Sequence, residues 1–176
     1  RLGRALEPYQ PLWFEEPIPP DNTAEMAKVA AAVSIPVATG ERLTTKAEFA
    51  PILRQGAASI LQPALGRSGG IWETKKIAAM AEAYQLPFAP HNPSGPIAHA
   101  ATMQLAACTP NFYLLETMAT DIPWRKELTT ESLVFKDGFF EIPDRPGLGL
   151  ELNEEAFADH PYQPRPLRHY RGDLTE

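Results

Sequence analysis

The sequence has few of the features that mark secreted, membrane-spanning or nucleic-acid-binding proteins. Cysteine occurs once, at Cys108, which excludes an internal disulfide and is typical of a reducing compartment. No apolar run approaches the roughly 18 residues that a membrane span needs. Sixteen basic against twenty-two acidic residues give a net charge of −6, which disfavours nucleic acid as a partner. No secretory leader is recognisable, and we therefore expect a cytoplasmic enzyme with neither membrane nor nucleic acid as partner.

Proline, in contrast, is abundant, with 19 of the 176 residues against a usual share of about 5%. That many prolines imply many boundaries between secondary-structure elements. Three Trp, eight Phe and a hydrophobic fraction of 44% suffice to fill a core, which excludes disorder as the main description. The length suits one ordinary domain or part of a larger one.

Five short apolar runs alternate with longer stretches of helical spacing. Such runs are typical of buried parallel strands, and strand–loop–helix order at regular spacing indicates βα units. The expected strands are 12–14, 35–38, 59–61, 86–89 and 112–115, and the expected helices are 23–33, 45–55, 71–84 and 96–108.

The residues at the ends of these runs are Glu15, Glu41, Ala64, His91 and Glu116, at intervals of 26, 23, 27 and 25 residues. A (β/α)₈ barrel of roughly 250 residues spends about that length on each unit. A doubly wound open sheet has similar spacing, but the glycine-rich phosphate turn that usually follows its first strand does not occur here. We therefore predict an α/β fold with about five βα units of a TIM-type barrel. Barrel active sites form at the C-terminal ends of the strands, where four of these five residues would converge.

A different pattern follows Glu116. Residues 135–142 predict a hairpin with an Asp137–Gly138 turn, and residues 154–158 predict a short helix. The expected division is a partial barrel (1–122), a small C-terminal capping segment with the hairpin (123–160) and an extended tail (161–176).

The acidic strand ends suggest a metal site. Glu15 and Glu41 follow successive strands, and Mg²⁺ prefers carboxylate and water oxygens. His91 would stand beside them, where an imidazole can act as a general base. The alternatives are that such acids merely face solvent, and that His91 is a loop residue bonded to a backbone carbonyl. Glu116 could donate to a substrate carboxylate or repel it.

Several motifs together resemble the enolase superfamily, mandelate racemase group, and within it the galactonate dehydratase-like acid-sugar dehydratases. The similarity extends over nearly everything from Leu12 to Leu152. It rests on the segments WFEEP (13–17), ATGER (38–42), LQP with SGG (61–63, 68–70), APH (89–91), KIAAMAEA (76–83), GPIA (95–98) and DRPGLG (144–149).

The resemblance implies roles for individual residues. Glu15 and Glu41 match two of three acidic Mg²⁺ ligands, His91 matches the general base, and Glu116 matches the group that binds the substrate's carboxylate. Glu16, Arg42 and Asn92 stand next to these residues and are expected, with Glu116, to bind substrate. The chain would then be the C-terminal portion of the barrel, with Mg²⁺ as its cofactor.

Two departures from the family pattern matter. The third metal ligand, an Asp, would lie upstream of Arg1, together with a capping domain. Ala64 stands where many members carry an Asp that orients the histidine, so the second nitrogen of His91 would lack a carboxylate partner. The expected partners are a sugar-acid substrate, the N-terminal half in the same polypeptide or in another chain, and further copies in a homo-oligomer.

The implied reaction is the dehydration of a galactonate-like sugar acid. A base removes the proton next to the carboxylate, an enediolate forms, and loss of the neighbouring hydroxyl gives a 2-keto-3-deoxy acid. Two alternatives stay open: a racemase, epimerase or cycloisomerase of the same superfamily, and a catalytically silent barrel segment.

Overall fold

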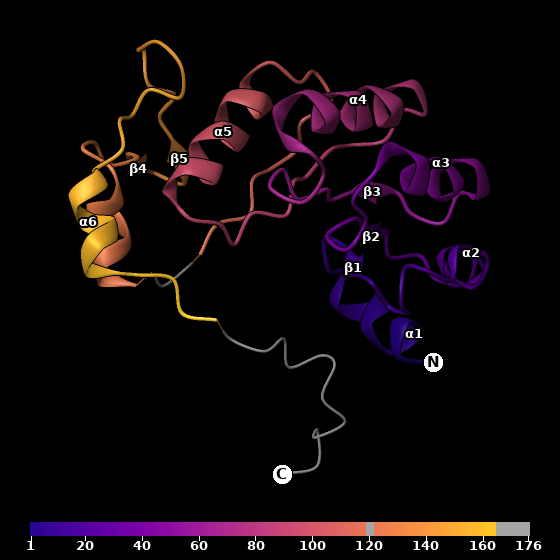
Figure 1. Ribbon diagram of the computed structural model, residues 1–176. Helices are drawn as coiled ribbons and strands as arrows, with labels where there is room; N and C mark the ends of the chain where they lie inside the picture. Colours follow the sequence, from indigo (N-terminus) through magenta and orange to yellow (C-terminus); the bar gives the residue numbers. More distant parts are fainter. Residues whose placement is uncertain (119–121, 165–176) are drawn as a thin grey trace.

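A parallel sheet runs through the centre of the computed structural model, which describes residues 1–118 and 122–164 (Figure 1). Its strands β1 (Phe14–Glu15), β2 (Val37–Thr39) and β3 (Ile60–Leu61) lie in the order in which they occur in the chain. Phe14 pairs with Val37, and Thr39 pairs with Leu61. The C-terminal ends of successive strands therefore meet along one edge.

Two further expected strands continue this sheet as single bridges. Phe88 pairs in parallel with Leu61, and Phe112 pairs in parallel with Phe88. Backbone hydrogen bonds of 2.9 Å join Ala89 N to the Leu61 carbonyl and Tyr113 N to the Phe88 carbonyl. All five apolar runs thus belong to one parallel series, and the predicted barrel-type α/β fold is confirmed. Only one or two residues of each run form a bridge pair, so the ladders are shorter than the runs.

A helix follows each of the first four strand segments, and these helices surround the strands in an arc (Figure 1). Along this arc, α2 contacts α3, α3 contacts α4, and α4 contacts α5. Their bounds lie within two residues of the predicted ones: α2 (Thr23–Ala32), α3 (Lys46–Gln55), α4 (Gly70–Ala83) and α5 (Pro96–Ala107).

Local side-chain chemistry sets the ends of these helices. Asn22 Oδ1 accepts a hydrogen bond from Glu25 N at the start of α2. At α3, the Glu48 carboxylate accepts hydrogen bonds from the backbone N–H groups of Thr44 and Thr45, both at 2.8 Å. Gly56 ends α3 with φ 61°, a left-handed conformation that favours glycine.

The core lies between the sheet and the helices. Met26, Phe49, Ile52, Leu61 and Ile77 belong to one cluster and are all fully buried. Burying each such side chain contributes roughly 1.5–3 kcal/mol. This packing anchors the strands and holds their C-terminal ends in place.

The region after the barrel strands contains the predicted hairpin and helix. Strands β4 (Phe135–Lys136) and β5 (Phe139–Phe140) are antiparallel, with positive φ at both Asp137 and Gly138, and α6 spans Glu154–Asp159. Most of the predicted tail, residues 165–176, lies outside the described residues. The division into barrel, cap and tail stays a prediction.

Three short helices were not predicted from the sequence. They are α1 (Leu2–Leu6), η1 (Glu7–Tyr9) and η2 (Pro123–Leu128). Each is too short to show a 3.6-residue period. Within residues 1–118 and 122–164, no helix combines the length and apolar character required to cross a membrane.

Candidate active site

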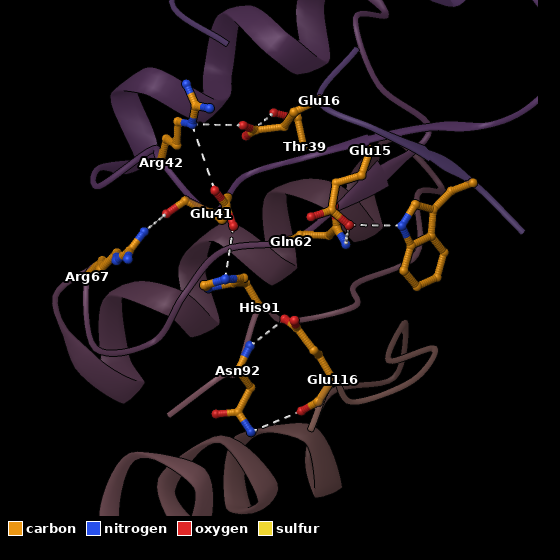
Figure 2. A network of polar contacts seen from close by, with 11 residues as sticks. Glu15, Glu16, Thr39, Glu41, Arg42, Gln62, Arg67, His91, Asn92 and Glu116 are labelled. Carbon is orange, nitrogen blue, oxygen red and sulfur yellow. Dashed lines mark hydrogen bonds and ion pairs between the residues drawn. The ribbon is translucent and has the colours of Figure 1, made fainter. Parts of the chain in front are cut away.

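Polar side chains from five neighbouring strand segments gather at the C-terminal edge of the sheet (Figure 2). They follow or end β1, β2, β3 and the strand segments at Phe88 and Phe112. The set comprises Glu15, Glu41, Gln62, His91 and Glu116. This is the edge at which barrel enzymes carry their active sites.

Gly40 lets two of these strand ends approach closely. Its φ is +148°, and a Cβ atom on it would lie 2.6 Å from the carbonyl carbon of Gln62. Since real Cβ atoms do not come that close to backbone, only glycine fits between Thr39 and Glu41. Steric crowding thus explains why the ATGER segment has a glycine at this position.

His91 contacts one of the two predicted metal ligands. Its Nε2 lies 2.9 Å from Oε2 of Glu41, with the imidazole 11% exposed and the Glu41 side chain 30% exposed. Arg67 Nη1 donates to the backbone carbonyl of Glu41 at 3.0 Å. A carboxylate oxygen only accepts, so Nε2 carries the shared hydrogen. The structure thus brings the predicted base and a predicted ligand into direct contact.

The other ring nitrogen of His91, Nδ1, has no hydrogen-bond partner among the described residues. Nδ1 is also buried. Ala64, which is itself buried, offers no polar side chain. That Ala64 is the cause of this missing partner stays a prediction.

Glu15, the first predicted ligand, is held by neutral donors. Its Oε2 accepts hydrogen bonds from Trp13 Nε1 at 3.0 Å and from Gln62 Nε2 at 2.9 Å (Figure 2). These donors orient the carboxylate without cancelling its charge.

Glu16 and Arg42, both expected to bind substrate, bind each other. Arg42 Nε lies 3.1 Å from Glu16 Oε2 and 3.8 Å from a Glu41 oxygen, and Thr39 Oγ1 donates to Glu16 Oε1 at 3.1 Å. Burial raises the pKa of Glu16 above its ordinary value; the Thr39 hydrogen bond and the Arg42 charge act against this shift, and the Glu41 charge adds to it. Glu16 also has a positive φ of 35°. The pair therefore flanks Glu41 and helps to place it.

Asn92 and Glu116 form a second pair. Asn92 N donates to Glu116 Oε2 at 2.9 Å, and Asn92 Nδ2 donates to the Glu116 backbone carbonyl at 3.1 Å. The Asn92 side chain is buried, whereas Glu116 is exposed. Asn92 is thus placed to orient Glu116, and their predicted contact with substrate stays a prediction.

The donor chemistry at this edge fits a hard cation in part. Glu15 and Glu41 offer carboxylate oxygens from adjacent strands, the ligand type that Mg²⁺ takes. In the described part of the chain, no group of three or more His, Cys, Asp or Glu side chains is arranged to hold a metal ion. The roles of Glu15 and Glu41 as metal ligands therefore stay a prediction.

Four residues of this network were not singled out as site residues from the sequence. Trp13, Thr39, Gln62 and Arg67 each donate to one of the predicted acidic residues. Position alone could have found Gln62. It comes directly after β3, much as Glu41 comes shortly after β2, with Gly40 between them.

Known proteins are similar to this chain in sequence and in fold. Residues 1–156 match the family described as enolase C-terminal domain-like. The chain is 41% identical over 187 residues to D-galactonate dehydratase of Variovorax paradoxus, which covers 99% of this chain and 49% of that protein. It is 39% identical over 160 residues to D-xylonate dehydratase of Haloferax volcanii, with 91% and 39% covered. A mandelate racemase/muconate lactonizing enzyme from Sulfitobacter sp. has a crystal structure that superposes with a TM-score of 0.88 at 56% identity, covering 94% of this chain and 41% of that one.

These matches confirm both the family that the sequence resembles and the barrel-type fold. The chain spans about two fifths to one half of the length of each relative. It belongs to the enolase C-terminal domain-like family and corresponds to the C-terminal part of its galactonate dehydratase-like members.

Proposed function

We propose that this chain carries part of the active site of an acid-sugar dehydratase. The observation that supports this most is the contact of 2.9 Å between His91 Nε2 and Glu41 at the edge of a barrel sheet. The dehydratase names of relatives at about 40% identity agree with it. The substrate would be a sugar acid of the galactonate or xylonate kind, and the product would be a 2-keto-3-deoxy acid and water.

Mg²⁺ is the cofactor we propose, with Glu15 and Glu41 as the residues of this chain that would hold it. When bound, such an ion supplies positive charge that stabilises the negative charge developing on the substrate's carboxylate. Trp13 and Gln62 would keep the Glu15 carboxylate oriented for this task.

His91 would remove the proton next to the substrate's carboxylate. Because Nε2 carries a hydrogen toward Glu41, His91 can accept a proton at Nε2 only after that hydrogen has left. In the reactive tautomer the hydrogen sits on Nδ1, which faces no acceptor among the described residues. We therefore propose that His91 acts as the base, although no hydrogen bond from Nδ1 to a described residue fixes the orientation of its ring.

Glu116 is proposed to bind the substrate's carboxylate through one proton shared between the two carboxyl groups, because two ionised carboxylates can only accept hydrogen bonds. Asn92 would fix the position of Glu116. Arg42 stands beside Glu16 and Glu41, and its exposed guanidinium would bring positive charge to the approaching acid. The homo-oligomer and an upstream half that completes the site also stay proposals.

A second candidate is a catalytically silent member of the family. The specific observation in its favour is that Nδ1 of His91 is buried and has no hydrogen-bond partner among the described residues. An epimerase of the same family would use the same base without loss of a hydroxyl.

A substrate screen separates these candidates. The full-length protein is incubated with Mg²⁺ and a panel of hexonic and pentonic acids in D₂O. Keto-acid formation supports the dehydratase, and deuterium exchange with inversion supports the epimerase. Absence of both with every acid supports the silent member and contradicts our proposal.

A further inference from the structure

Gln62 occupies the centre of the strand-end network. It follows β3 directly, between the ends of β1 and β2 on one side and His91 on the other (Figure 2). Its side chain is only 5% exposed. The backbone is fixed as well, since Gln62 N donates to the Thr39 carbonyl at 2.8 Å and Gly40 packs against it. The side chain thus starts from a rigid position.

The orientation of its amide follows from chemistry. Gln62 Nε2 lies 2.9 Å from Glu15 Oε2. An ionised carboxylate only accepts hydrogen bonds, so the NH₂ group must face Glu15 and the oxygen must face the other way. That oxygen, Oε1, is buried and has no hydrogen-bond partner among the described residues.

A buried acceptor of this kind needs a donor. Three donors of the network serve other acceptors: Trp13 Nε1 serves Glu15, His91 Nε2 serves Glu41, and Arg67 Nη1 serves the Glu41 carbonyl. An unmet buried acceptor is costly, and a ligand hydroxyl removes that cost by donating O–H.

An unpartnered amide oxygen does not suffice to mark a site. Asn111 Oδ1 is also buried without a partner, while its Nδ2 donates to the carbonyls of Ala78 and Leu86. Asn111, however, precedes Phe112 and so lies at the opposite end of its strand. Gln62 differs because its amide is fixed by a carboxylate of the candidate active site.

We propose that Gln62 is a specificity-determining residue, whose Oε1 accepts a hydrogen bond from one hydroxyl of the sugar-acid substrate while Nε2 holds Glu15. This inference rests on the proposed function and narrows it. The ligand must carry a hydroxyl that points to the end of β3, so that an acid without that hydroxyl leaves Oε1 unsatisfied.

Two variants separate the two ends of the amide. Gln62→Met has similar length and removes both hydrogen bonds. Gln62→Lys keeps a donor toward Glu15 and removes only the acceptor. Asn111→Leu is the matched control, because it removes a similar amide away from the site. Thermal melting establishes that each variant is folded.

Calorimetric titration of the full-length protein then measures binding of D-galactonate and D-xylonate, each with its monodeoxy analogues. Gln62→Lys should bind the parent acid roughly 10-fold to 100-fold more weakly and should bind one monodeoxy analogue as well as the unsubstituted protein does. Gln62→Met, which also releases Glu15, should bind every acid more weakly, but should lose more affinity for the parent acid than for that analogue. Asn111→Leu should leave all affinities unchanged.

The inference is overturned if Gln62→Met weakens all analogues by the same factor, or if Gln62→Lys restores parent affinity; either result leaves Gln62 with only a role in holding Glu15. Turnover is recorded separately with the same acids. Hydroxyl-dependent binding without turnover overturns the proposed dehydratase activity while supporting the role of Gln62.

Discussion

His91 Nε2 and Glu41 Oε2 lie 2.9 Å apart, which joins the end of β2 to the loop after Phe88. A base held against a carboxylate is oriented by it, and the imidazolium that forms on proton uptake is stabilised by the neighbouring negative charge. The same contact occupies one oxygen of Glu41. The proposed base and one proposed metal ligand therefore act as a unit rather than as independent groups.

Replacing His91 by Ala tests the base directly. General-base assistance is typically worth about 10²–10⁴-fold, so His91→Ala in the full-length protein should lower kcat by that order with KM little changed. His160→Ala is the control, because His160 stacks on Trp124 in the C-terminal region. Equal kcat values for His91→Ala and the unsubstituted protein would place the base elsewhere.

Restoring an acceptor for Nδ1 should improve the base. The family resemblance implies that an Asp at position 64 orients the histidine, and Nδ1 of His91 is buried without a partner among the described residues, so Ala64→Asp is expected to supply that partner. Since partners of this kind are typically worth 10-fold to 100-fold, kcat should rise by about tenfold. The gain should vanish when Ala64→Asp is combined with His91→Ala. A gain that persists in the double variant would show that the new carboxylate does not act through His91.

Removing one proposed metal ligand should abolish the turnover that depends on Mg²⁺. Glu41→Gln keeps the size of the side chain and loses its charge, so turnover stimulated by Mg²⁺ should be abolished. Glu25→Gln on the exposed face of α2, where Glu25 pairs with Lys28, is the matched control. Activity that survives both chelation and Glu41→Gln would make Glu15 and Glu41 surface acids.

Acid should weaken the start of α3. Hydrogen bonds from the backbone of Thr44 and Thr45 lower the pKa of Glu48 below its ordinary value. A lowered carboxyl pKa contributes stability that is complete above the ordinary value of about 4.3 and is lost as pH falls through the lowered one. The stability difference between the unsubstituted protein and Glu48→Gln should therefore shrink as pH falls from 6 to 3 in thermal melts. A constant difference would contradict this origin.

The fold could be predicted because its determinants are local in the sequence. The helix start at Thr45 and its end at Gly56 are readable as a capping residue and a C-terminal glycine. The strands are readable as apolar runs, and their parallel order follows from the helices between them. The sequence also indicates which positions belong to the candidate site, because the C-terminal ends of parallel strands converge.

The contacts within the site could not be predicted, since they depend on side-chain directions between residues distant in sequence. Arg42 and Glu16 are 26 residues apart and form an ion pair, which no spacing rule reveals. The position of Gln62 after β3 could mark it as a strand-end residue, but its hydrogen bond to Glu15 is visible only in the structure. Burial likewise decides that Nδ1 of His91 is unpartnered.

Proton NMR of the full-length protein with D-galactonate or D-xylonate and Mg²⁺ in D₂O tests the central proposal most directly. The account predicts loss of the signal of the hydrogen next to the carboxylate and appearance of a 2-keto-3-deoxy acid. Both changes should require Mg²⁺ and should be slower by about 10²–10⁴-fold in His91→Ala. Unchanged spectra for both acids, with folded protein and Mg²⁺ present, would contradict it.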